Sequence, residues 1–132
     1  MKLNEWAVHH IRFKDSMRRK IKDLQVTDHH IKVIEKHELK DYYVNENLSN
    51  ALENIQDVKH KQFIITTNNR ENVQTLLKNW DELTTYRNLN IIFANVKENR
   101  SWHINPATHH FIADKKTFKE GIWHLHESIP RS

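Results

Sequence analysis

The sequence predicts one α/β domain over residues 1–132, in which a mixed sheet with a central parallel β-α-β unit is flanked by helices. A continuously apolar run at 63–65 and a mostly apolar run at 89–96 are typical of strands buried on both faces. The segment 70–86 between them has apolar residues at helical spacing. Because a helix joins the two strands, we expect parallel neighbours with a right-handed crossover. A chain of 132 residues fits a single domain.

The first half of the chain predicts a long helix, a hairpin and a short helix. Residues 4–24 form one amphipathic helix in this interpretation, and strands at 30–36 and 41–45 follow as a hairpin. A short helix over 48–57 leads to the first buried strand. The apolar stripe expected for the first helix consists of Trp6, His10, Phe13, Met17, Ile21 and Leu24.

The last third of the chain predicts one more strand and two helices. Residues 101–104 read as a strand, and Asn105 with Pro106 reads as the N-cap and first residue of a short helix that reaches residue 112. The capping box Thr117-Phe-Lys-Glu120 predicts the start of the final helix. The expected order is α-β-β-α-β-α-β-β-α-α.

The composition excludes several classes of site. A single glycine cannot build the glycine-rich phosphate loops, which need two or three glycines at fixed offsets. The absence of cysteine excludes thiol catalysis, cysteine-based zinc sites and disulfides. No stretch approaches the ~20 apolar residues of a membrane span. We therefore expect a soluble cytoplasmic protein without a membrane partner.

Positive charge is concentrated near the start of the chain. The whole chain has 21 Lys and Arg against 17 Asp and Glu, and Asp15 is the one acid between positions 12 and 22. Such a run is typical either of a solvated helix face or of a surface that follows a phosphate backbone. The candidate nucleic-acid contacts are Arg12, Lys14, Arg18, Arg19 and Lys22.

The element order resembles the restriction-endonuclease-like (PD-(D/E)xK) fold over about residues 5–96. The resemblance implies two carboxylates that hold Mg²⁺ or Mn²⁺ and a lysine that helps to position water. The literal spacing occurs as Asp41 followed by Asp57-Val58-Lys59. By element order, however, the pair belongs in the segment Asn45-Glu46-Asn47, where asparagine replaces the first acid and the lysine. The resemblance thus implies a nuclease-like fold that has lost its catalytic positions and needs no cofactor.

Polar residues at the ends of the predicted strands form a second candidate site, since ligands of open parallel sheets bind beyond the carboxyl ends of strands. The alternative is that these side chains are ordinary caps and turns. This polar rim consists of Thr67, Asn68, Asn95, His103 and Asn105. A metal site assembled from His103, His109 and Asp114 also remains open.

Three function hypotheses follow from these observations. The leading one is a non-catalytic, nucleic-acid-associated protein, and the second is a metal-dependent nuclease that uses Asp41, Asp57 and Lys59. The third is an adaptor that docks a partner protein through Trp102 and Trp123. A homodimer is a further hypothesis, because exposed aromatic side chains often mark an interface.

Overall fold

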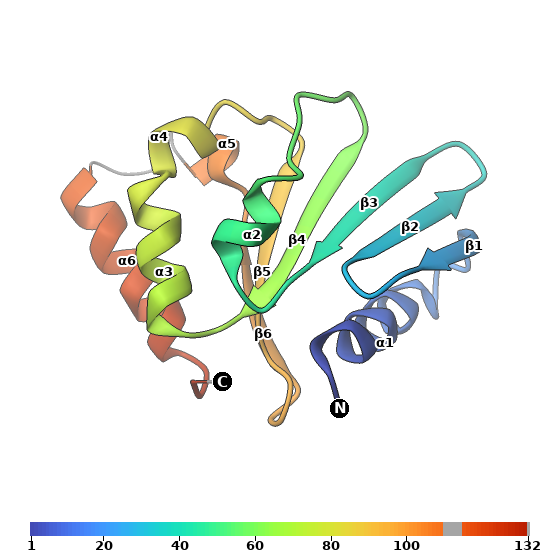
Figure 1. The fold of residues 1–132 in the computed structure, drawn as a ribbon, viewed down its shortest axis with the longest axis horizontal. Helices are drawn as coiled ribbons and strands as arrows, with labels where there is room; N and C mark the ends of the chain where they lie inside the picture. The colour runs from blue at the N-terminus through green and yellow to red at the C-terminus, as the bar shows by residue number, and fades with distance from the viewer. Residues whose placement is uncertain (110–114, 132) are drawn as a thin grey trace.

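The computed structural model describes residues 1–109 and 115–131 and contains one mixed six-stranded sheet with flanking helices (Figure 1). This confirms the predicted fold class. The strands are β1 (Ile21–Val26), β2 (His30–Glu35), β3 (Leu39–Val44), β4 (Lys61–Thr67), β5 (Leu89–Asn95) and β6 (Arg100–Ile104). The helices are α1 (Leu3–Asp15), α2 (Leu48–Leu52), α3 (Arg70–Lys78), α4 (Trp80–Leu83), α5 (Pro106–His109) and α6 (Lys115–Glu127).

The strands lie side by side in chain order, from β1 at one edge to β6 at the other. β1, β2 and β3 pair antiparallel, β3, β4 and β5 pair parallel, and β6 returns antiparallel to β5. The predicted hairpin is therefore present as β2–β3, and the predicted parallel unit is present as β4-α3-β5.

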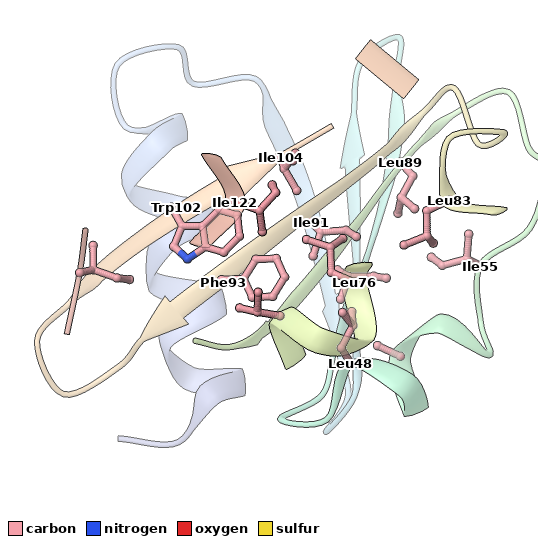
Figure 2. Close-up of a cluster of buried hydrophobic side chains, with 14 residues drawn as sticks. Leu48, Ile55, Leu76, Leu83, Leu89, Ile91, Phe93, Trp102, Ile104 and Ile122 are labelled. Carbon is pink, nitrogen blue, oxygen red and sulfur yellow. The ribbon is translucent and has the colours of Figure 1, made fainter. Parts of the chain in front are cut away.

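Two buried clusters lie on opposite faces of the sheet. Consecutive residues of β4 are divided between them, since Ile64 belongs to one cluster and Ile65 to the other. α1 covers the face of Ile65, whereas α2, α3 and α6 cover the face of Ile64 (Figure 1). On the latter face, the rings of Phe93 and Trp102 stack at 4.2 Å between centroids (Figure 2). Burial on both sides explains why consecutive residues in the middle of β4 and of β5 are apolar.

The first helix is shorter than the sequence predicts, and the missing part is strand β1. Helix α1 ends at Asp15, whose carboxylate accepts hydrogen bonds from the backbone N–H groups of Lys20 (2.8 Å) and Ile21 (3.2 Å). Arg19 adopts a left-handed conformation with φ of 50°. This turn directs the chain into the sheet at Ile21, so a helix extending to residue 24 was a wrong prediction.

Two expected core residues, one at the end of α1 and one in the following turn, lie in solvent. Phe13 and Met17 are 79% and 92% exposed. Trp6 of the predicted stripe is buried, and the other buried residues of α1 are Leu3, Ala7 and Ile11.

Other boundaries also differ from the prediction. The helix expected over 70–86 is divided at Asn79, whose side chain donates to the carbonyl of Thr75 (2.8 Å). The helix expected over 48–57 ends at Leu52, and the last helix starts at Lys115. The predicted extension of the short helix from Pro106 to residue 112 lies outside the described residues beyond position 109. No helix in the described ranges is long and apolar enough to cross a membrane.

Candidate functional site

Six exposed cations gather where α1 turns into β1, and we call them the cationic surface: Arg12, Lys14, Arg18, Arg19, Lys20 and Lys22. Arg12 and Lys14 belong to the last turn of α1, and Lys22 belongs to the edge strand β1. Among the described residues, no carboxylate lies within ion-pair distance of any of the six. Asp15 uses both carboxylate oxygens to hold the turn. The cationic charge is therefore available to an external anion.

A hollow of about 520 Å³, here called the Lys14 hollow, opens beneath the last turn of α1. β2, β3 and β4 each contribute alternate residues to its floor, which places these side chains on one face of the sheet. These floor residues are Val33, Glu35, Lys40, Tyr42, Lys61 and Phe63. Cations of the cationic surface, namely Lys14, Arg18 and Lys20, also line the hollow.

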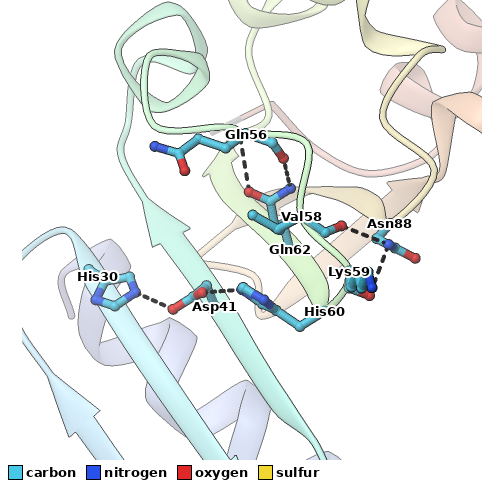
Figure 3. A network of polar contacts seen from close by, with 8 residues as sticks. All are labelled: His30, Asp41, Gln56, Val58, Lys59, His60, Gln62 and Asn88. Carbon is cyan, nitrogen blue, oxygen red and sulfur yellow. Dashed lines mark hydrogen bonds and ion pairs between the residues drawn. The ribbon is translucent and has the colours of Figure 1, made fainter.

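A second polar site lies on the other face of the sheet, where Asp41 accepts hydrogen bonds from two imidazoles (Figure 3). Nε2 of His30 lies 2.7 Å from one carboxylate oxygen, and Nε2 of His60 lies 2.5 Å from the other. Because an ionised carboxylate only accepts, both Nε2 atoms carry the proton. Asp41 is 7% exposed. Burial alone would raise the pKa of Asp41, but the hydrogen bonds from His30 and His60 together lower it.

This histidine cluster borders a shallow hollow of about 530 Å³, which also includes Lys32 and Tyr43. Register explains the arrangement, since Lys32 pairs with Asp41 and His30 pairs with Tyr43 across the β2–β3 hairpin. The sequence did not indicate the cluster, because its three members come from β2, β3 and the loop before β4. Only strand register and the path of that loop bring them together.

The residues of the nuclease alternative lie in different surroundings. Asp41 is bonded to the two imidazoles, whereas Asp57 and Lys59 are exposed in the loop between α2 and β4. Figure 3 shows Lys59 beside Asn88, with His60 between Lys59 and Asp41. In the described part of the chain, no three or more histidine or acidic side chains are grouped so that they could hold a metal ion.

The segment that the nuclease resemblance singles out, Asn45-Glu46-Asn47, begins at the carboxyl end of β3. Asn45 and Glu46 line a hollow of about 400 Å³ together with Asp28 of the β1–β2 turn and Asn4 of α1. The side chain of Asn47 caps α2 by accepting from the N–H of Ser49 (3.0 Å). Asn47 therefore has a structural role at the position where the resemblance would place a lysine.

Asn68 of the predicted polar rim is a structural residue. It is fully buried, and its Oδ1 accepts from Nε1 of Trp102 (2.9 Å) and from Nδ1 of His126 (2.8 Å). Since indole nitrogen only donates, this contact fixes the orientation of the amide and makes Nδ1 of His126 the protonated nitrogen. Burial is the main cause that lowers the pKa of His126, which agrees with a neutral ring.

The side chains of two other residues of the polar rim also form hydrogen bonds to backbone groups. The amide of Asn95 donates to the carbonyls of Pro130 (2.9 Å) and Arg131 (3.1 Å). Asn105 caps α5, as predicted, by accepting from the N–H of Thr108 (2.9 Å). The remaining members, Thr67 and His103, are half-buried and exposed, respectively.

Two further sequence hypotheses can be placed on the structure. Trp102 is 5% exposed and belongs to the core, so its ring is covered in this chain, whereas Trp123 is half-buried with the guanidinium of Arg70 5.7 Å from its ring centroid. Of the metal set His103, His109 and Asp114, the last lies outside the described residues.

Comparisons of the chain with protein-family models, with curated proteins and with solved structures found no match. What the protein does must therefore be inferred from its own residues.

Proposed function

We propose that the protein is a non-catalytic nucleic-acid-binding protein with a nuclease-like fold, which contacts the phosphate backbone through its cationic surface. The observation that carries this proposal is the lack of a carboxylate partner, among the described residues, for the exposed cations between positions 12 and 22. Cations that are already neutralised by neighbours gain little from a phosphate, whereas these six release counterions when phosphates replace them.

The shape of this region also favours an extended polyanion. Arg12 and Lys14 project from a helix, Arg18 and Lys20 from a turn, and Lys22 from an edge strand. Charges spread over three successive elements suit a ligand that carries a regular series of negative groups. A homodimer would double this surface and remains a separate hypothesis.

Two observations favour binding over cleavage. The resemblance places catalytic residues at Asn45 and Asn47, which provide neither a carboxylate nor an ammonium group. The literal alternative uses Asp41, whose two oxygens are already bonded to imidazoles. A strand-cleavage assay with Mg²⁺ or Mn²⁺ tests that alternative directly, and product formation that depends on Asp41, Asp57 and Lys59 would favour the nuclease.

The proposal is tested by charge reversal within the cationic surface. We expect Arg18→Glu/Arg19→Glu to lower the affinity for a labelled oligonucleotide at least tenfold, measured by fluorescence anisotropy. The matched control is Lys116→Glu/Lys119→Glu, which makes the same charge change on exposed residues of α6, on the opposite side of the sheet (Figure 1). Equal affinities of the two double variants would refute the proposal, because net charge alone would then explain the binding.

A further inference from the structure

The Lys14 hollow exists because α1 continues past the end of its apolar face. Leu3, Ala7 and Ile11 are buried against the sheet at a spacing of four residues. Lys14 follows Ile11 by three residues, so it lies on the same side of the helix one turn further along. A lysine in place of a core residue leaves space under this turn, and both Ile11 and Lys14 line that space.

The inner wall of the hollow is aromatic. Tyr42 and Phe63 are partners in the β3–β4 register, and their rings stack with 4.3 Å between centroids and 8° between planes. Tyr42 is buried and Phe63 is half-buried, and both line the hollow. Burial, aided by Glu35 and Glu38, raises the pKa of Tyr42, so its hydroxyl remains neutral and available for hydrogen bonding.

Some charged side chains around the hollow form ion pairs, and others do not. Lys40 is paired with Glu35 (3.2 Å), and Lys61 is paired with Glu38 (3.7 Å). Both members of each pair line the hollow. The remaining cations on its rim are Lys14, Arg18 and Lys20, and the remaining acid is Asp15, which holds the turn. The rim therefore offers three cations beside an aromatic wall.

We propose that the Lys14 hollow binds one unpaired nucleotide, with the base against Tyr42 and Phe63 and the phosphate among Lys14, Arg18 and Lys20. Its volume of about 520 Å³ falls within the range of small-molecule sites. Aromatic side chains provide stacking surfaces for any base, and adjacent cations bind the phosphate. The inference rests on the proposed function and narrows it to single-stranded nucleic acid.

The preference for an unpaired nucleotide follows from access. A base inside a duplex is stacked and paired, so it enters a hollow only after it is extruded, which costs free energy. A single strand does not incur this cost. Phe13, which is 79% exposed on the same turn of α1, adds a second stacking surface for a neighbouring base of the strand.

The experiment compares three probes against the full chain at one salt concentration. They are a labelled single strand of about twelve nucleotides, the duplex of the same length, and AMP as a competitor. We expect the single strand to bind about 5- to 100-fold more tightly than the duplex. If AMP displaces the strand, a free nucleotide is sufficient to occupy the Lys14 hollow. If the strand binds and AMP does not displace it, the hollow binds a nucleotide only as part of a nucleic-acid chain.

Substitution of the aromatic wall provides the second readout. Phe63→Leu keeps an apolar side chain but removes the ring, so we expect it to lose most of the preference for the single strand while duplex affinity is unchanged. Phe118→Leu on α6 is the matched control, because Phe118 is also half-buried and lies on the other face of the sheet. In the unmodified protein, NMR signals of the Tyr42 and Phe63 rings should shift when the strand binds, which requires no variant to fold.

The possible failures are distinguishable. If single strand and duplex bind equally and Phe63→Leu changes neither affinity, the nucleotide site is refuted while binding by the cationic surface stands. Unshifted ring signals of Tyr42 and Phe63 at saturation also refute the site. If Arg18→Glu/Arg19→Glu leaves both affinities unchanged, the proposed function itself fails.

Discussion

Replacement of Asn68 by alanine tests whether this polar residue at the carboxyl end of a strand stabilises the fold or binds a ligand. The Asn68 side chain accepts from Nε1 of Trp102 and Nδ1 of His126, and its amide donates to the carbonyls of His126 (3.1 Å) and Pro130 (3.4 Å). Alanine would leave the two ring donors without their acceptor in the interior. A buried donor left unsatisfied costs about 1–3 kcal/mol, so we expect the free energy of unfolding to fall by roughly 2–6 kcal/mol.

The assay is urea unfolding monitored by tryptophan fluorescence. The free energies of unfolding of wild type and variant are compared when both have the same slope against urea concentration. Asn50→Ala, at an exposed position of α2, is the control and should change stability by less than about 0.5 kcal/mol. A comparably small change for Asn68→Ala would refute the structural assignment. Lost oligonucleotide binding at unchanged stability would instead make Asn68 part of a functional rim.

Three further predictions concern single side chains. Asp41→Asn leaves one of the two imidazole N–H groups without an oxygen acceptor, so it should cost about 1–3 kcal/mol. Because folding lowers the pKa of Asp41, its carboxylate contributes to the free energy of unfolding at pH above its unfolded-state pKa. This contribution is lost as pH falls through its folded-state pKa. In the variant Asp41→Asn, the free energy of unfolding should therefore depend less on pH in this range. Burial, followed by the charges of Lys14 and His103, lowers the pKa of His10 from 6.5 to about 4. The free energy of unfolding should therefore decrease as pH is lowered from 6.5 to about 4. An NMR titration midpoint of His10 near 6.5 would contradict this prediction. Gly121→Ala should stabilise α6 by about 0.5–1 kcal/mol in thermal unfolding, because no atom of the described residues lies within 4 Å of the added Cβ; destabilisation would indicate an unrecognised contact.

The sequence predicted those parts of the fold whose local pattern and tertiary role agree. β4, α3 and β5 were predicted because burial on both faces makes a strand continuously apolar and burial on one face makes a helix periodic. β1 was missed because Ile21 and Leu24 continue the helical spacing of α1, and neither glycine nor proline marks the turn. That turn is made by the left-handed Arg19 and by the carboxylate of Asp15.

The candidate site was predictable only where it depends on composition. A run of cations is visible in the sequence, and these residues are exposed in the structure. The Lys14 hollow is not visible, because it depends on α1 ending over three strands that come from separate parts of the chain. Likewise, Asn68 reads as polar and potentially functional until its partners Trp102 and His126 are known.

The dependence of binding on salt tests most directly whether the cationic surface contacts phosphates. If the six cations of this surface each neutralise one phosphate, the logarithm of the duplex binding constant should fall with the logarithm of salt concentration with a slope of about −5.4. Arg18→Glu/Arg19→Glu should reduce the steepness of that slope by about 2, whereas Lys116→Glu/Lys119→Glu should leave it unchanged. A slope near zero, or one that the Arg18→Glu/Arg19→Glu change does not alter, would contradict binding by this surface.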